Sequence, residues 1–278
     1  MPNQYFSTKL GLAQGLIKAG GGLGGAVLSF SLDAIIQKLG VPWAFCILGF
    51  MALATGLPAA WIVRDRYPVR STSFIEWRLF RDFSFLMVFF AGAVATFALF
   101  VPAFFLPLYT HSLGLPSSTG AALLAGFNFS TAIGRLVSGF SCDYIGPLNT
   151  IFIAMLVNAM TMLSIWPASD TLAPLVAFAI INGVANGSFF TSMPTAVGTL
   201  YGSSRVPVAM GMVITGWTGG YFAGAPIAGY ILQAYGGKNP DQWAYRPAIF
   251  YAGSMALGAA GFVLILRLRL SLKIFKKL

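Results

Sequence analysis

The chain has 278 residues, of which 57% are hydrophobic and 9% are charged, and its formal net charge is +10. So little charge cannot solvate so much apolar surface, which excludes an ordinary soluble domain and indicates an all-α polytopic membrane protein. The bases cluster beside apolar runs rather than on one amphipathic face, so they predict contact with membrane lipid and not with nucleic acid.

Eight apolar runs follow one another, and each is long enough to cross a bilayer, which takes about 20 residues. We expect transmembrane helices at 11–32, 42–63, 83–108, 119–141, 148–167, 171–200, 207–232 and 245–266. A charged connector separates the second run from the third. The predicted organisation is therefore a helix pair in 1–63, a central cytoplasmic loop in 64–82 and a six-helix unit with a basic tail in 83–278.

The basic residues predict the orientation of these helices. If the N-terminus is cytoplasmic, thirteen of the 17 lysines and arginines fall on the cytoplasmic side and three on the other, while Lys18 lies within the first helix. Loops rich in lysine and arginine stay in the cytoplasm. We therefore expect both termini to be cytoplasmic, and we expect residence in the plasma membrane rather than in an organelle.

Glycines spaced four apart mark two of the predicted helices. Such spacing leaves a flat strip against which another helix can pack closely. The expected packing glycines are Gly20 and Gly24 in the first helix and Gly216, Gly220 and Gly224 in the seventh. The strips serve either static packing or surfaces that slide during a conformational cycle.

Arg135 and Asp143 require an explanation in a chain with so few charges. Arg135 lies roughly 9 Å inside the end of its helix, at 1.5 Å per residue, so its side chain must face the protein interior or a wet cavity. One interpretation is an anchor for an organic anion, because a guanidinium offers two parallel donors to a carboxylate. The other is a lock, in which Arg135 pairs with Asp143 or with helix-end carbonyls.

Further polar side chains lie at membrane depth. Asn128 is two helical turns before Arg135 and on the same face. Asn182 and Asn186 share a face of the sixth helix, and Trp217 and Tyr221 lie on the seventh. These residues are candidates for substrate binding or gating, and the alternative for each is hydrogen bonding between helices.

No catalytic constellation is visible in the sequence. Seven acidic residues are spread along the chain, the single histidine, His111, stands in a Gly/Ser loop, and neither a nucleophile elbow nor a phosphate loop occurs. The sequence therefore predicts neither an enzyme nor a cofactor or metal site.

A loop motif suggests a family. The motif Gly139-x-x-x-Asp143-x-x-Gly146 resembles the cytoplasmic loop signature of the major facilitator superfamily, without the bases that usually follow it. A second resemblance is to the monocarboxylate-transporter-like group, and most closely to its fungal members. It rests on the opening of the group's fifth helix and on its eighth-helix arginine, which are similar here to Tyr5-Phe6-x-x-Lys9-x-x-Leu12-Ala13-x-Gly15 and Arg135-x-x-x-Gly139.

The resemblance implies a partial major facilitator fold. The eight predicted helices would be the last two of the first half and a complete second half, so four helices would be missing upstream. We expect a truncated form of a longer chain, and the alternative is an unusual eight-helix protein. The family places the fifth helix against the eighth, so Gly20 and Gly24 are expected to face Gly126, Ser130 and Gly134.

The resemblance also implies a function. It predicts secondary active transport of a small organic solute, a monocarboxylate-like anion, by alternating access. Arg135 would bind the anion, and Gly139, Asp143 and Gly146 would form the cytoplasmic loop motif. A coupled proton is part of this expectation, although Thr131 stands where animal members often carry an acid. The alternatives are a neutral vitamin-like solute, and a non-transporting remnant or nutrient-sensing membrane protein.

Overall fold

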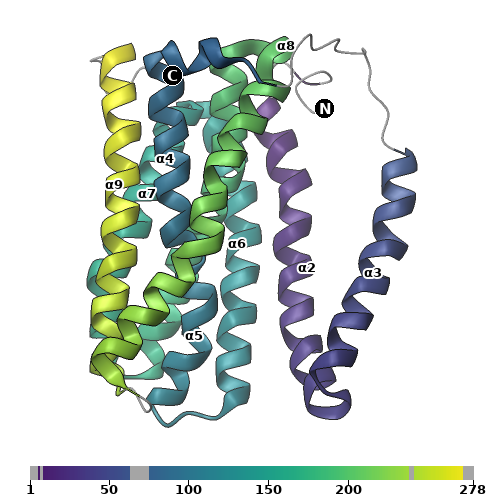
Figure 1. Cartoon of the computed structure of the whole chain (residues 1–278), viewed down its shortest axis with the longest axis vertical. Helices are drawn as coiled ribbons and strands as arrows, with labels where there is room; N and C mark the ends of the chain where they lie inside the picture. The colour runs from purple at the N-terminus through teal and green to yellow at the C-terminus, as the bar shows by residue number, and fades with distance from the viewer. Residues whose placement is uncertain (1–5, 7–8, 63–74, 238–240, 272–278) are drawn as a thin grey trace.

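The computed structural model describes residues 6, 9–62, 75–237 and 241–271, and the regular elements in these ranges are all helical. In chain order they are α2 (Leu10–Leu39), α3 (Val41–Ile62), η1 (Trp77–Arg81), α4 (Phe83–Leu99), α5 (Val101–Ser112), α6 (Ser117–Ile145), α7 (Pro147–Met160), η2 (Thr161–Ile165), η3 (Trp166–Ala168), α8 (Leu172–Gly236), η4 (Gln242–Tyr245) and α9 (Arg246–Leu270). The long helices run side by side, and α2 begins at the end of the molecule at which α9 ends (Figure 1).

Six stretches of the described residues are long and apolar enough to cross a membrane. They are Val41–Ile62, Phe83–Ser112, Ser117–Ile145, Pro147–Ala168, Leu172–Gly202 and Gln242–Leu270. The polytopic all-α class agrees with the prediction, but the number of spans does not. The runs predicted at 11–32 and 207–232 are helical, within α2 and α8, without being among the six. Both are rich in glycine, which adds no apolar side chain and so lowers the mean hydropathy of each run.

Three helices deviate from regular geometry, and two of the deviations have a local cause. The span predicted at 83–108 is broken at Phe100 into α4 and α5, with Pro102 in the first turn of α5. A proline is tolerated there because its missing N–H would have no helical partner. The α7 helix continues through the π turn η2. Within α8 the chain bends at Gly202, whose φ of 69° favours glycine.

Two apolar clusters hold α4 to α9 together. One lies towards the end where α4 begins and includes Phe85, Phe189 and Met193, which are almost fully buried. The other lies towards the opposite end and includes Tyr109, Trp166 and Phe178. These helices therefore form one packed bundle, and α2 lies along its side against α6.

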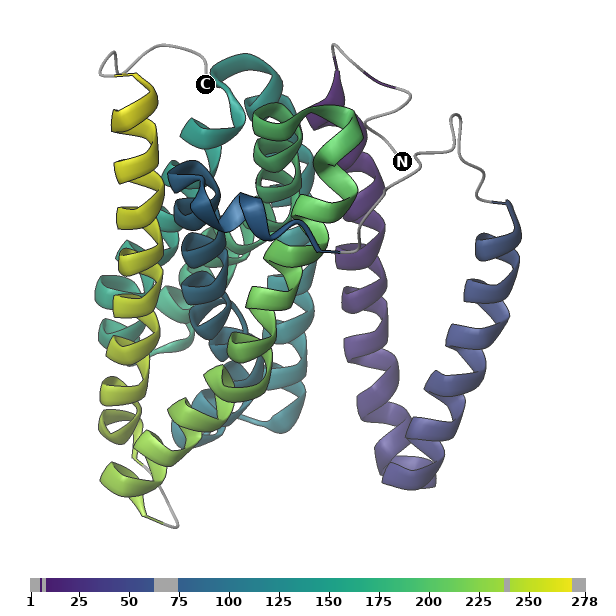
Figure 2. The ribbon, with the colours of Figure 1, turned by 45° about the horizontal axis from the view of Figure 1, so that its top comes forward.

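The α3 helix stands apart from this bundle. Figures 1 and 2 both show it diverging from α2 after meeting it at the end where α2 finishes. Ala44 is the one residue of α3 that is buried, and side chains such as Phe45 and Trp61 are 72% and 86% exposed. The predicted loop 64–82 lies mostly outside the described residues, and its described part forms η1.

Glycine allows close packing in two places. In the second half of α8, a Cβ added to Gly216, Gly220 or Gly224 would collide with Phe89, Thr96 or Phe97 of α4. In α2, the glycines that meet the backbone of α6 are Gly11, Gly15 and Gly22. This differs from the predicted contact, because an added Cβ at Gly20, Gly24 or Gly126 would meet nothing within 4 Å. Gly134 faces Val184 of α8, and Ser130 lies beside Gly183 of the same helix.

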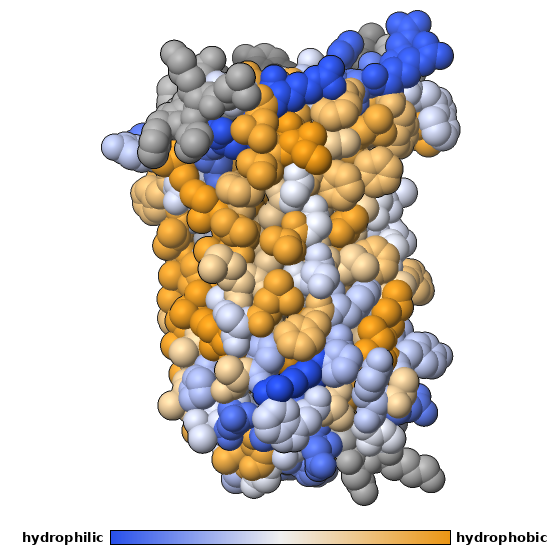
Figure 3. Space-filling view, turned by 90° about the vertical axis from the view of Figure 1, so that its left-hand side faces the viewer, coloured by the Kyte–Doolittle hydropathy of each residue, from blue (hydrophilic) through white to orange (hydrophobic). Residues whose placement is uncertain are grey.

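The surface of the molecule matches a membrane environment. Figure 3 views the side on which α9 lies, where a broad hydrophobic band separates two ends that carry strongly hydrophilic side chains. The apolar side chains of α9 that point outwards include Phe250, Leu257 and Ile265. The α9 helix lies within the candidate membrane span Gln242–Leu270.

Candidate functional site

The loop motif clamps the start of α2. Asp143, near the end of α6, accepts hydrogen bonds from the backbone N–H groups of Gly11 and Leu12, each at 2.9 Å. These N–H groups lie in the first turn of α2, where no helical acceptor exists and where the helix dipole favours a negative charge. The carboxylate of Asp143 therefore joins the first turn of α2 to the last turn of α6.

The two glycines of the motif have separate roles at this junction. The backbones of Gly139 and Gly11 are so close that a Cβ at Gly139 would lie 2.6 Å from the carbonyl oxygen of Gly11. Gly146 ends α6 with a φ of 95°, a conformation that favours glycine. Gly139 thus allows the approach of the helices, and Gly146 allows the sharp turn into α7.

Arg135 binds α2 rather than Asp143. Its Nη1 donates to the backbone carbonyl of Lys18 over 2.6 Å, and its Nε is buried without a hydrogen-bond partner. A Cβ at Gly21 would lie 2.7 Å from Nη1, so this glycine gives the guanidinium its space. Eight residues separate Arg135 from Asp143, about 12 Å along a helix. The lock between Arg135 and Asp143 is therefore absent from this arrangement.

Lys18 adds a second positive charge beside Arg135. Both side chains are partly buried, and their charges interact electrostatically. Within the described part of the chain, neither forms an ion pair with a carboxylate. Two neighbouring cations at membrane depth repel each other and are costly without a counter-charge. The site can therefore accept an anion.

Aromatic rings lie next to the cations. The guanidinium of Arg135 stands 5.4 Å from the ring centroid of Phe190, which contacts Phe100 and Trp217 at centroid distances of 6.2 and 6.3 Å. Tyr221 lies 4.8 Å from Phe100 and is 46% exposed, whereas Trp217 is 5% exposed. Tyr221 is thus the accessible ring of this series of contacts, and Trp217 is a buried one.

The three candidate asparagines contact neighbouring helices. Asn128 donates weakly to the carbonyl of Gly25 in α2, over 3.5 Å. Asn186 donates over 2.6 Å to the carbonyl of Leu99, at the break between α4 and α5, and Asn182 donates over 2.8 Å to Oγ1 of Thr161. Asn182 and Asn186 are also almost fully buried. The structure thus brings Arg135 and Asn128 against α2, places Tyr221 beside Phe100, and directs Asn182 and Asn186 into the bundle.

Sequence reasoning did not single out Phe100 and Phe190, and it left the role of Lys18 open. Nothing marks Phe100 and Phe190 among the 25 phenylalanines of the chain, because only packing brings them beside Arg135. Lys18 does carry a signal, since it is a base inside a glycine-rich helix.

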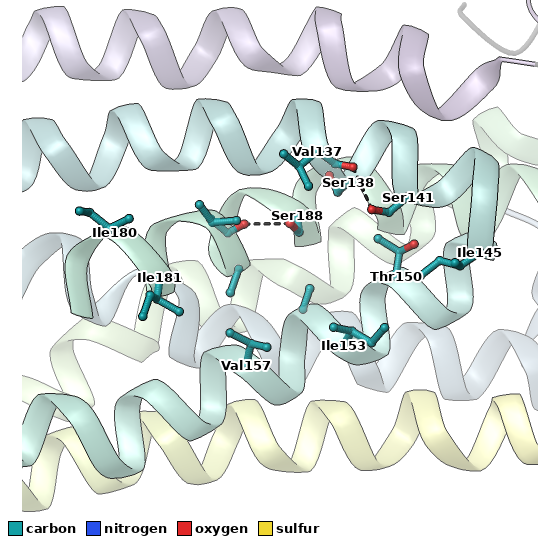
Figure 4. A pocket seen from close by; sticks show the side chains of 13 residues that line it. Val137, Ser138, Ser141, Ile145, Thr150, Ile153, Val157, Ile180, Ile181 and Ser188 are labelled. Carbon is teal, nitrogen blue, oxygen red and sulfur yellow. Dashed lines mark hydrogen bonds between the residues drawn. The ribbon is translucent and has the colours of Figure 1, made fainter. Parts of the chain in front are cut away.

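A separate groove lies between α6, α7 and α8 (Figure 4), with a volume of about 360 Å³. Its walls are mainly aliphatic, with Val137, Ile153 and Ile181 among them. The hydroxyls of Ser141 and Ser188 point back to carbonyls of their own helices, those of Val137 and Val184. The groove thus has no charged side chain in its lining, and the hydroxyls of Ser141 and Ser188 donate to the protein rather than to a ligand. In this respect it differs from the site at Arg135 and Lys18.

Comparison with known proteins gives a consistent picture. The family model for the Major Facilitator Superfamily matches residues 1–175 and 88–274. Among curated proteins, the chain is 29% identical over 258 residues to the aspyridones efflux protein apdF of Emericella nidulans, which covers 92% of this chain and 53% of that protein. It is 25% identical over 268 residues to the MFS transporter asaE of Aspergillus flavus, with 95% and 59% covered.

The agnestins efflux protein AgnL12 of Paecilomyces divaricatus is a further relative. It is 26% identical over 276 residues, which cover 96% of this chain and 60% of the relative. The chain thus spans just over half the length of these three curated relatives.

Proposed function

The chain belongs to the Major Facilitator Superfamily, and from that premise we propose that it acts in secondary active transport of a small organic anion by alternating access. The observation that supports an anionic substrate is the pair of cations, Lys18 and Arg135, which lack a carboxylate partner within the described residues. A monocarboxylate-like group fits the fork of a guanidinium. Relatives named as transporters and efflux proteins support transport, and the word efflux favours export as its direction.

The proposal assigns roles to the residues around the cations. Arg135 and Lys18 hold the anionic group, and Phe190, Phe100 and Tyr221 contact the organic part of the solute. Asp143 and Gly139 hold the ends of α2 and α6 together, so they act as a gate that opens and closes with the cycle. The hydroxyl of Thr131 donates a hydrogen bond to the backbone carbonyl of Phe127 in the same helix. Because a threonine hydroxyl does not release its proton near neutral pH, a coupled proton would need another carrier.

We also propose an arrangement in the membrane. The α2 and α3 helices belong to the first half of the family fold and α4 to α9 to the second, with the start of α2 and the end of α9 on the cytoplasmic side of the plasma membrane. The excess of bases near this end supports that orientation. Reporter fusions at Leu278 and in the 233–245 segment should lie on opposite sides of the membrane.

Transport by the purified chain in proteoliposomes tests the proposal. Radiolabelled benzoate and lactate serve as anionic probes, and nicotinamide serves as a neutral vitamin. We expect Arg135→Lys to weaken transport of the acids markedly and Arg135→Gln to weaken it by roughly tenfold or more, because an anion would lose a desolvated charge partner. Asn182→Ala is the matched control, since this side chain faces Thr161 inside the bundle.

Two results would contradict the proposed substrate class. One is transport of nicotinamide without transport of either acid, which would favour the neutral solute. The other is unchanged acid transport by Arg135→Gln. If the chain transports none of the probes while it folds normally, the non-transporting alternative gains support.

A further inference from the structure

A group of arginines lies at the corner of the bundle where η1 leads into α4 and α9 ends. Arg78 and Arg81 belong to η1, and Arg269 belongs to the last turn of α9. The guanidinium of Arg269 lies 4.1 Å from the ring centroid of Phe83, the first residue of α4. We call Trp77, Arg78, Arg81, Phe83 and Arg269 the Phe83 corner. Its three arginines are exposed.

Arg269 is held in place without using its hydrogen-bond donors. The ring of Phe83 fixes one face of its guanidinium, and its N–H groups form no hydrogen bond to the described residues. Arg246, at the other end of α9, also stacks on a ring, that of Trp243 at 3.8 Å, but its Nη2 donates to the carbonyl of Pro167 over 3.1 Å. Arg267 is buried, and its Nε donates to Asn149. Arg269 therefore offers a positioned guanidinium to a molecule outside the protein.

The carboxylates beside the corner are engaged elsewhere. Asp82 accepts from the backbone N–H of Ser84 and from the hydroxyl of Tyr201, each at 2.9 Å. Glu76 pairs with Arg205 at 3.7 Å. Within the described ranges, Arg78, Arg81 and Arg269 have no acidic partner, so the corner keeps an excess of positive charge.

The corner lies at the depth of lipid headgroups. The candidate span Phe83–Ser112 begins at this corner, and the candidate span Gln242–Leu270 ends at it. Hydrocarbon therefore surrounds the helices on one side of the corner, and water lies on the other. Leu79 is 4% exposed and anchors η1 in the bundle, while Trp77 is 71% exposed. An exposed tryptophan at a span end is typical of the aromatic belt at the membrane interface.

We propose that the Phe83 corner binds the headgroup of an anionic glycerophospholipid. Arg269, which lies against the ring of Phe83, and Arg81, which precedes Phe83 by two residues, bind the phosphate and the second acidic group of the headgroup. Guanidinium groups bind such oxygens two at a time. Arg78 adds charge, and Trp77 lies along the glycerol region. Charge complementarity selects this occupant, because a cluster of bases at the end of a membrane span attracts anionic lipid.

Native mass spectrometry of the purified full chain measures this binding. The protein is equilibrated with equal amounts of phosphatidylserine and phosphatidylcholine of the same acyl chains, and the bound adducts are counted. We expect wild type to retain phosphatidylserine preferentially. In the double variant Arg81→Gln/Arg269→Gln, the ratio of bound phosphatidylserine to bound phosphatidylcholine should fall by about tenfold, because each base near an anionic surface contributes to the attraction. Raising the salt from about 0.1 M to about 1 M should weaken the preference in wild type.

Arg246→Gln is the matched control, because it also removes an arginine stacked on a ring at an end of α9. We expect it to keep the phosphatidylserine preference, with thermal unfolding of all variants confirming that they fold. Equal retention of the two lipids by wild type would overturn the proposal, as would an equal loss in Arg246→Gln. A preference abolished by millimolar inorganic phosphate would also overturn it, since the site would then hold a free anion rather than a lipid.

Discussion

The neighbouring helices α2 and α3 both contain glycines, yet they relate to the rest of the molecule in opposite ways. The buried positions of α2 are small residues and Gln14, and its Gly11, Gly15 and Gly22 meet the backbone of α6. In α3, Gly49 and Gly56 have nothing within 4 Å of an added Cβ, and the helix is exposed nearly all round. A glycine in a membrane helix therefore indicates close packing only where another helix lies opposite.

The largest effect should come from filling the α2–α6 contact. A side chain at Gly22 would meet backbone atoms of Ala132 at 2.7 and 2.8 Å, and backbone cannot rotate away. We expect Gly22→Leu to destabilise the chain by about 3 kcal/mol, as overpacking does. Thermal unfolding in detergent micelles measures the change.

Gly49→Leu in α3 is the matched control for this substitution. It lies in a helix interior with open space around it, so we expect no loss of stability. Equal losses in Gly22→Leu and Gly49→Leu would remove the distinction between the two helices.

The next effect concerns the clamp on the start of α2. Asp143→Ala removes the acceptor for the N–H groups of Gly11 and Leu12, and we expect a loss of about 1–2 kcal/mol, as for other helix caps. Hydrogen exchange should accelerate at these two amides and remain unchanged in α3. Unaltered exchange at Gly11 and Leu12 would show that Asp143 does not cap α2.

A smaller effect is expected for the coupling between Arg135 and Asp143. Arg135 binds the Lys18 carbonyl and Asp143 binds the first turn of α2, so the two side chains have separate partners. Stability losses of Arg135→Gln and Asp143→Asn should add within about 0.5 kcal/mol in a double-mutant cycle. A larger coupling energy would show that Arg135 and Asp143 interact directly, as the lock requires.

The smallest effect should come from the exposed face of α3. Phe50 is 70% exposed, so Phe50→Ala should change stability by no more than about 0.5 kcal/mol in detergent. The same unfolding assay measures it. A loss of several kcal/mol would mean that another protein surface covers this side chain in the purified protein.

Site residues differ in how far the sequence could identify them. Arg135 and Asp143 stand out because charges are rare and expensive in an apolar chain. Asn182 and Asn186 were equally polar candidates, but an amide gives no sign of whether it faces a cavity or a neighbouring helix, and here both face neighbours. Phe190 gave no signal, because its role depends on standing 5.4 Å from Arg135.

Composition and spacing were sufficient for the class of protein and the course of most helices, since apolar runs of membrane length and the glycines and prolines between them are local properties. They were also sufficient for the loop motif. Only the tertiary structure decided how each helix is rotated about its axis. A glycine strip predicts that some helix approaches, but the rotation is set by packing with distant segments. For that reason Gly22, rather than Gly20, meets α6, and Arg135 reaches the carbonyl of Lys18 rather than Asp143.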